Sequence, residues 1–266
     1  MSVTGSVRVG VVVTLGCCLI GVGCGEQQEA QRYEVEVFAD GTKLEPVQTD
    51  RGYEVEVDSV AMAVQQFEFT VGGQTHDGGE ASLLQTVEGW FVSEAAAHPN
   101  HAAGGETGGV FAGPMLVEWT AGEIEPLGGG EFLQGEYAGY DVTFADDGVD
   151  LEEGIIGRVE GVATDAGGAE FSFGVDIEYG TGASVVGGAL SATIPDDDME
   201  GIGLQLLSSD EWSEQSLFDG VNFSDHLDAE EEHAELDLES NDAARVRSAV
   251  VAHEFYAGEV VHSQQM

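Results

Sequence analysis

The sequence predicts a mainly β protein, either an antiparallel β-sandwich or a barrel-like domain, with two or three short helices. Segments of alternating apolar and polar residues recur roughly every ten residues, which is typical of these folds. The chain also contains 39 glycines, which suit the tight turns and bulges between such strands. A parallel α/β fold is disfavoured because few long helical patterns separate the strands.

The expected strands are justified in chain order by period-two alternation and by Gly or Asp-Gly breaks between them. Glu170–Tyr179 is the clearest case, because its odd-numbered residues are all apolar and would form one buried face. The expected strands are Tyr33–Phe38, Tyr53–Val57, Ala61–Val71, Val110–Trp119, Gly130–Tyr137, Tyr140–Phe144, Ile155–Ala163, Glu170–Tyr179 and Gly187–Ile194.

Three short segments are predicted to be helical. Glu80–Val92 has apolar residues at helical spacing, and Ser209–Trp212 resembles a capped turn. Near the C-terminus, Ser240 can cap a helix that would carry Val246, Val250 and His253 on one stripe. The acidic stretch at 225–242 is expected to be a mobile loop.

The charge balance excludes one large class of partners. The chain has 51 Asp and Glu residues against seven Lys and Arg, a formal net charge of −44, and Lys43 is the only lysine. Nucleic acid is therefore not an expected partner, because binding to phosphates depends on Lys and Arg. The composition resembles that of halophile proteins, in which carboxylates hold a hydrated surface in concentrated salt. A polyanionic cation sponge is the alternative, but the acids are spread along the whole chain, which favours surface solvation.

The N-terminal residues are predicted to form an export signal. Residues 1–23 contain no acid, one cation at Arg8, and then an apolar run too short for a membrane-spanning helix. Gly21-Val22-Gly23-Cys24 resembles a bacterial lipoprotein lipobox, although Gly21 stands where Leu is usual. The resemblance implies that Cys24 is lipidated and becomes the new N-terminus; cleavage before Cys17 and an uncleaved anchor helix are the alternatives.

This interpretation divides the chain into a signal peptide at 1–23, a lipidated tether at 24–31 and a single β-rich domain at 32–266. All three cysteines lie at or before Cys24, so no disulfide or thiolate metal site is expected in the domain. The mature protein would be anchored to a membrane by the lipid on Cys24, in the periplasm or at the cell surface.

Histidines provide the most specific chemical hypothesis. His98 and His101 lie three residues apart in a Gly-rich stretch, and His76 and Glu106 are candidates to complete a site. Zn²⁺ or Cu²⁺ would accept two or three imidazoles and a carboxylate. The alternative is that these are solvated loop histidines.

Calcium binding and catalysis are less favoured. Asp146–Glu153 and Asp196–Glu200 supply carboxylates but do not match a calcium-loop register, so turn solvation is the preferred interpretation. No nucleophile elbow, zinc-protease motif or phosphate loop occurs, so the chain is not expected to be an enzyme. The prediction is a lipid-anchored extracytoplasmic binding lipoprotein for a divalent transition metal. The alternative is a metal-free surface module that contacts protein or polysaccharide.

The lipid anchor is directly testable. Cys24→Ser should abolish labelling with palmitate and move the protein out of the detergent phase, because the acyl chains have no other attachment point in the predicted lipobox. Cys17→Ser is the matched control and should keep both properties. Continued labelling of Cys24→Ser would show that the assignment is wrong.

Overall fold

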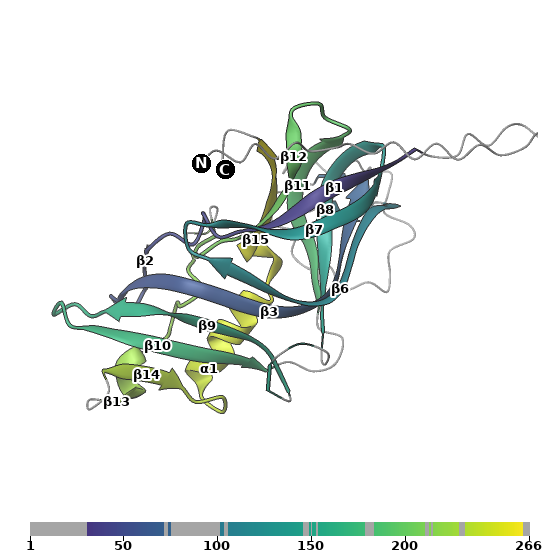
Figure 1. Cartoon of the computed structure of the whole chain (residues 1–266). Coiled ribbons are helices and arrows are strands. Elements are labelled where there is room, and N and C mark those ends of the chain that lie inside the picture. Colours follow the sequence, from purple (N-terminus) through teal and green to yellow (C-terminus); the bar gives the residue numbers. More distant parts are fainter. Residues whose placement is uncertain are drawn as a thin grey trace, which may run out of the picture. The chain divides into compact units, whose positions relative to one another are not determined.

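The structure, a computed structural model, is mainly β (Figure 1). The part from Gln31 onward forms one compact unit. The structure describes residues 31–71, 74–75, 102–103, 106–145, 149, 151–152, 154–178, 184–210, 213, 215–228 and 232–262.

Eight strands close into a barrel, because the first and last of them pair with each other. An eight-stranded barrel has an interior that side chains can fill. In spatial order the strands are β3 (Glu54–Val71), β6 (Glu106–Thr120), β7 (Ile124–Leu133), β1 (Arg32–Asp40), β12 (Met199–Leu206), β15 (Tyr256–His262), β11 (Ser184–Ile194) and β8 (Gly135–Phe144), which returns to β3.

Additional strands extend the sheet from β3. They are β9 (Ile155–Thr164), β10 (Glu170–Glu178), β14 (His233–Leu236) and β13 (Leu227–Asp228), and β2 (Val47–Gln48) also pairs with β3. A separate two-stranded ladder joins β4 (Gln74–Thr75) to β5 (Ala102–Ala103). The helical elements are η1 (Phe223–Asp225), α1 (Asn241–Val250) and η2 (His253–Phe255).

β3 belongs to both the barrel and the extension. On one edge its residues from Val64 to Val71 pair with β8, and those from Glu54 to Met62 pair with β9. The sequence predicts two strands here, and this is wrong: β3 is one strand of 18 residues. No Gly or Pro interrupts it, and register shifts at Val57/Ser59 and Val64/Gln66 accommodate its course.

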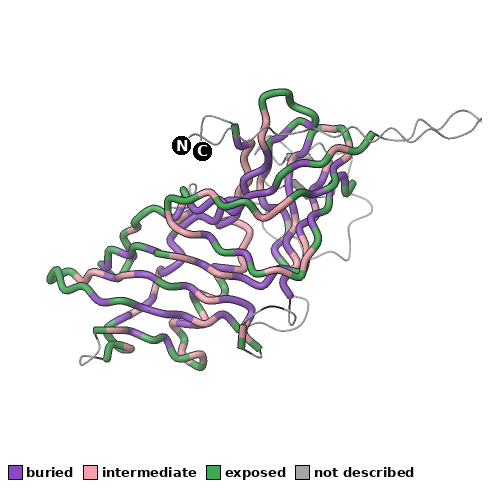
Figure 2. The backbone as a smooth tube through the Cα atoms, viewed as in Figure 1, coloured by how far each residue is buried: buried purple, intermediate pink, exposed green. Residues whose placement is uncertain are grey.

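Aromatic rings and satisfied polar atoms fill the barrel. Phe69 and Phe132 have ring centroids 4.8 Å apart. Trp119 Nε1 donates a 2.7 Å hydrogen bond to the carbonyl of Leu204, which joins β6 to β12 across the interior. Burial raises the pKa of the Tyr140 hydroxyl well above its ordinary value, so this group stays protonated and donates to the carbonyl of Ala257 at 2.9 Å. Figure 2 shows the buried residues along the strands of the barrel.

A second group of aromatic rings lies under the extension. Phe223 contacts Tyr53 and Phe173, with ring centroids 5.3 and 4.9 Å away. α1 packs against β10 and buries Ala243, Val246 and Val250. The helix starts after Ser240, whose hydroxyl accepts a hydrogen bond from the Ala243 amide at 3.0 Å.

Several finer predictions are wrong. The sheet is mixed instead of antiparallel, because β1–β12, β11–β15 and β10–β14 are parallel pairs. In the described residues α1 is the one α-helix, not one of two or three. Ser209 forms a β-bridge with Ser216, and Glu211 and Trp212 of the predicted Ser209–Trp212 turn lie outside the described residues. His253 lies in η2, beyond the helical stripe. The predicted helix at Glu80–Val92 lies outside the described residues.

The acidic stretch at 225–242 is not simply a loop, because it contains β13, β14 and the start of α1. Arg158 on β9 explains how an acidic strand can join the sheet. Its guanidinium contacts Glu160 at 2.8 Å, Asp176 at 2.6 Å and Glu235 at 3.0 Å. One cation therefore links β9, β10 and β14. His233 on β14 also bonds the Ser172 hydroxyl on β10 at 2.8 Å.

The ionisation of Glu235 reflects this cluster. Partial burial raises the pKa of Glu235, but hydrogen bonds from Arg158 and His233 outweigh it and hold the pKa below its ordinary value. A carboxylate with a depressed folded-state pKa stabilises the fold above its unfolded pKa, about 4.3 for Glu. That contribution is lost as the pH falls through the lower folded-state value.

Arg158→Gln should lower the free energy of unfolding at pH 7 by about 1–2 kcal/mol, because three carboxylates would lose their shared cation. Arg32→Gln is the matched control: its ion pair with Glu131 is 65% and 76% exposed, so the loss should be under about 0.5 kcal/mol. Urea unfolding in buffered KCl measures both. Equal effects of the two substitutions would contradict a structural role for the Arg158 cluster.

Candidate functional site

The predicted metal ligands are only partly described. Cys24, His76, His98 and His101 lie outside the described residues. Glu106 begins β6, is exposed, and pairs with Val71 in the ladder to β3. Within the described part of the chain, no group of three or more His, Cys, Asp or Glu side chains is arranged to hold a metal ion. The transition-metal site thus stays a prediction.

Other polar residues singled out by the sequence have local partners. His226 Nε2 lies 3.1 Å from Asp242 Oδ2, in a contact that ties the 222–226 segment to the first turn of α1. In the Asp196–Glu200 segment, the Asp196 carboxylate accepts a 3.0 Å hydrogen bond from the Asp198 amide, as a turn residue does. Among the described residues, no helix is long and apolar enough to cross a membrane.

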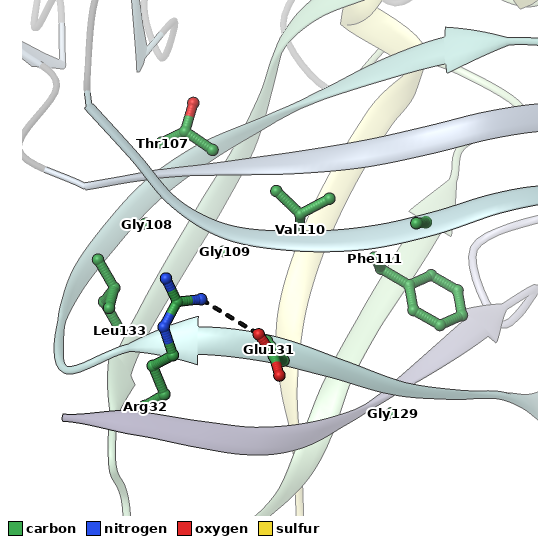
Figure 3. A pocket seen from close by; sticks show the side chains of 10 residues that line it. Arg32, Thr107, Gly108, Gly109, Val110, Phe111, Gly129, Glu131 and Leu133 are labelled. Carbon is green, nitrogen blue, oxygen red and sulfur yellow. Dashed lines mark hydrogen bonds and ion pairs between the residues drawn. The ribbon is translucent and has the colours of Figure 1, made fainter. Parts of the chain in front are cut away.

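The described surface has a groove of about 500 Å³ on β6, β7 and the start of β1, which we call the β6–β7 groove (Figure 3). Backbone and small or apolar side chains make up most of its wall, and Arg32 and Glu131 form an ion pair at 3.1 Å beside it. Its lining residues are Arg32, Thr107, Gly108, Gly109, Val110, Phe111, Ala112, Gly129, Glu131 and Leu133.

The groove lies where two paired strands separate. The ladder between β6 and β7, both fully described, contains two residue pairs, Gly109 with Phe132 and Val110 with Glu131. β6 pairs with β3 over nearly its whole length, from Glu106 to Thr120. Figure 3 shows β6 and β7 diverging beyond Val110, with the Phe111 ring in the space between them. Among the described residues, one edge of β6 is therefore without a ladder partner for most of its length.

Glycines shape this region. Gly109 is buried, and a Cβ there would collide with the ring of Phe132. Gly128 has φ +130°, a backbone conformation that side chains disfavour, and the Phe111 ring lies 3.7 Å from the position of its absent Cβ. Gly109 thus makes room for the Phe132 ring on the inner side of the diverging strands, and Gly128 permits the positive φ of β7 beside Phe111.

The β6 wall of the groove belongs to an uncharged stretch of the chain. Residues 107–117 carry no charged side chain, and neither do residues 179–195, although 22% of the whole chain is charged. Val110 and Leu116, both on β6, are 38% and 39% exposed; Leu227 is the other exposed large hydrophobic residue in the described part. The sequence predicts only a strand here, and its missing charge does not by itself mark a site, because residues 179–195 share it.

The groove lining carries few polar side chains. Thr107 supplies the one side-chain hydroxyl, and neither His nor Cys lines the groove. Phe111 is 7% exposed, and no aromatic side chain among the described residues is exposed. Sugar rings that bind by stacking need an accessible aromatic face, so the described surface is better suited to an apolar ligand with hydrogen-bonding groups.

Comparisons with protein-family models, with curated proteins and with solved structures find no match for this chain.

Proposed function

We propose that this chain is an exported, lipid-anchored binding protein whose β6–β7 groove receives a segment of a partner protein. The anchor is the lipid predicted on Cys24, and the location is the periplasm or the cell surface. The observation that carries the proposal is the β6–β7 groove, whose β6 wall from Thr107 to Ala112 is uncharged and partly apolar, on a protein with a net charge of −44.

An uncharged patch on such a surface calls for a specific reason. Carboxylates elsewhere hold water at the surface. Exposed Val110 and Leu116, in contrast, make an unfavourable contact with water, which costs free energy. A groove of about 500 Å³ lies within the size range of ligand sites. Apolar contact with a partner would remove the exposed surface of Val110 and Leu116 from water.

A protein partner is favoured over a polysaccharide. The groove offers strand backbone, methyl groups and one Arg–Glu pair, which match a polypeptide, and its one aromatic ring is buried. Binding of Zn²⁺ or Cu²⁺ by His76, His98, His101 and Glu106 is a separate proposal that does not depend on the groove. No catalytic role is proposed.

Photo-crosslinking in the cells that export the protein tests this function. With Val110 replaced by p-benzoylphenylalanine in the full chain, irradiation should produce an adduct with a protein, because residue 110 lines the groove. The same replacement of Leu227, which is similarly exposed on β13, is the matched control and should produce none.

Equal adducts at residues 110 and 227, or none at residue 110, would contradict the proposal. An adduct at residue 110 that glycosidases remove, and that contains no peptide, would favour the polysaccharide alternative.

A further inference from the structure

We propose that the partner segment binds as an added β-strand along the free edge of β6, and that this segment is apolar in its middle and basic at its ends. This inference rests on the proposed function of the β6–β7 groove and specifies how the groove recognises its ligand.

The backbone of β6 supports strand addition. β6 is paired with β3 on one side, while its other edge is paired with β7 only at Gly109 and Val110. In a strand, the amide and carbonyl groups of alternate residues point to opposite edges. Beyond Val110 the groups on the β7 side therefore have no ladder partner among the described residues, and an extended peptide can supply one. Pro114 has no N–H and is the one residue of β6 that cannot donate to such a peptide.

Side chains along this edge suit an apolar strand. Val110 and Leu116 are exposed, and Met115 is half-buried against the core. Successive side chains of an added strand point to opposite faces, so every second residue of the ligand would lie on the outer face with Val110 and Leu116, and the residues between them would lie on the inner face with Met115. Small or β-branched apolar residues fit such a surface best.

Charge complementarity specifies the ends of the ligand. Exposed acidic side chains border the uncharged stretch: Glu34, which lies beside Gly129, together with Glu131 and Glu118. Lys or Arg residues flanking an apolar segment would face these carboxylates, and an acidic flank would be repelled by the whole molecule. Basic ends should matter most at low salt, because molar salt screens such contacts.

The opposite end of the sheet does not offer an equivalent edge. β13, the outermost strand of the extension, has two residues, Leu227 and Asp228. Asp225 precedes it, so a short and acidic edge lies there. Short, charged edges are poor templates for strand addition.

A synthetic decapeptide of alternating Val and Thr residues, with two Lys residues at each end, is a suitable probe. The full lipidated chain is placed in lipid nanodiscs, and empty nanodiscs serve as the blank. Fluorescence anisotropy then gives the affinity of the probe and of variants that are each N-methylated at one amide.

Methylation at every second amide should weaken binding about tenfold, while methylation of the amides between them should have little effect, because alternate amides face β6. Val110→Asp and, independently, Leu116→Asp should each weaken binding at least tenfold. Leu227→Asp, at a matched exposed site, should leave the affinity unchanged.

If the probe binds and both β6 substitutions weaken it but methylation shows no period of two, strand addition is wrong while binding at β6 stands. If the probe does not bind, or binds the Val110→Asp and Leu116→Asp variants as tightly as the wild type, the inference is overturned. The crosslinking at residue 110 decides the proposed function separately.

Discussion

The surplus of carboxylates is the constraint on which the rest of the structure depends. With 51 acidic residues and seven Lys and Arg residues, most acids cannot have a cationic partner. The described residues meet this constraint in two ways. In one way, Arg158 forms ion pairs with three carboxylates at the same time. The buried Asp40 uses neutral donors, the Thr42 amide and the Gln205 side-chain amide, each at 2.9 Å.

The surplus of carboxylates also bears on the β6–β7 groove. Several strands in the described part bury one face and turn an acidic face to solvent, as β1 does with Glu34 and Glu36. Between residues 107 and 117 the outward side chains of β6 are uncharged. This uncharged stretch includes the place where β6 and β7 separate. The proposed ligand site therefore rests on both surface chemistry and backbone pairing.

Local sequence patterns predicted the bounds of several strands and the start of the helix. Alternation predicted β1, β9 and β10 to within about two residues at each end, and the Ser240 cap predicted the start of α1. β12 and β15 were missed, because glycines interrupt their short apolar patterns and both depend on pairing with distant strands. The hairpin turn at Gln134 was missed because no Gly or Pro break marks that residue itself.

Barrel closure and the groove could not be predicted from local patterns. Closure requires β8 to pair with β3, whose residues are some 70 positions earlier, and spacing alone does not specify that partner. The groove arises from a ladder that stops after two residue pairs. For the predicted metal site, the structure describes only Glu106, so the histidine hypothesis still rests on sequence.

Thermal unfolding of the wild-type chain across KCl concentration tests the role of charge most directly. If repulsion among carboxylates limits stability, the melting temperature should rise from about 0.1 M KCl, with most of the rise below about 1 M, where the Debye length has shrunk to about 3 Å. A melting temperature independent of KCl would contradict the account, because it would mean that the carboxylates are already compensated within the fold.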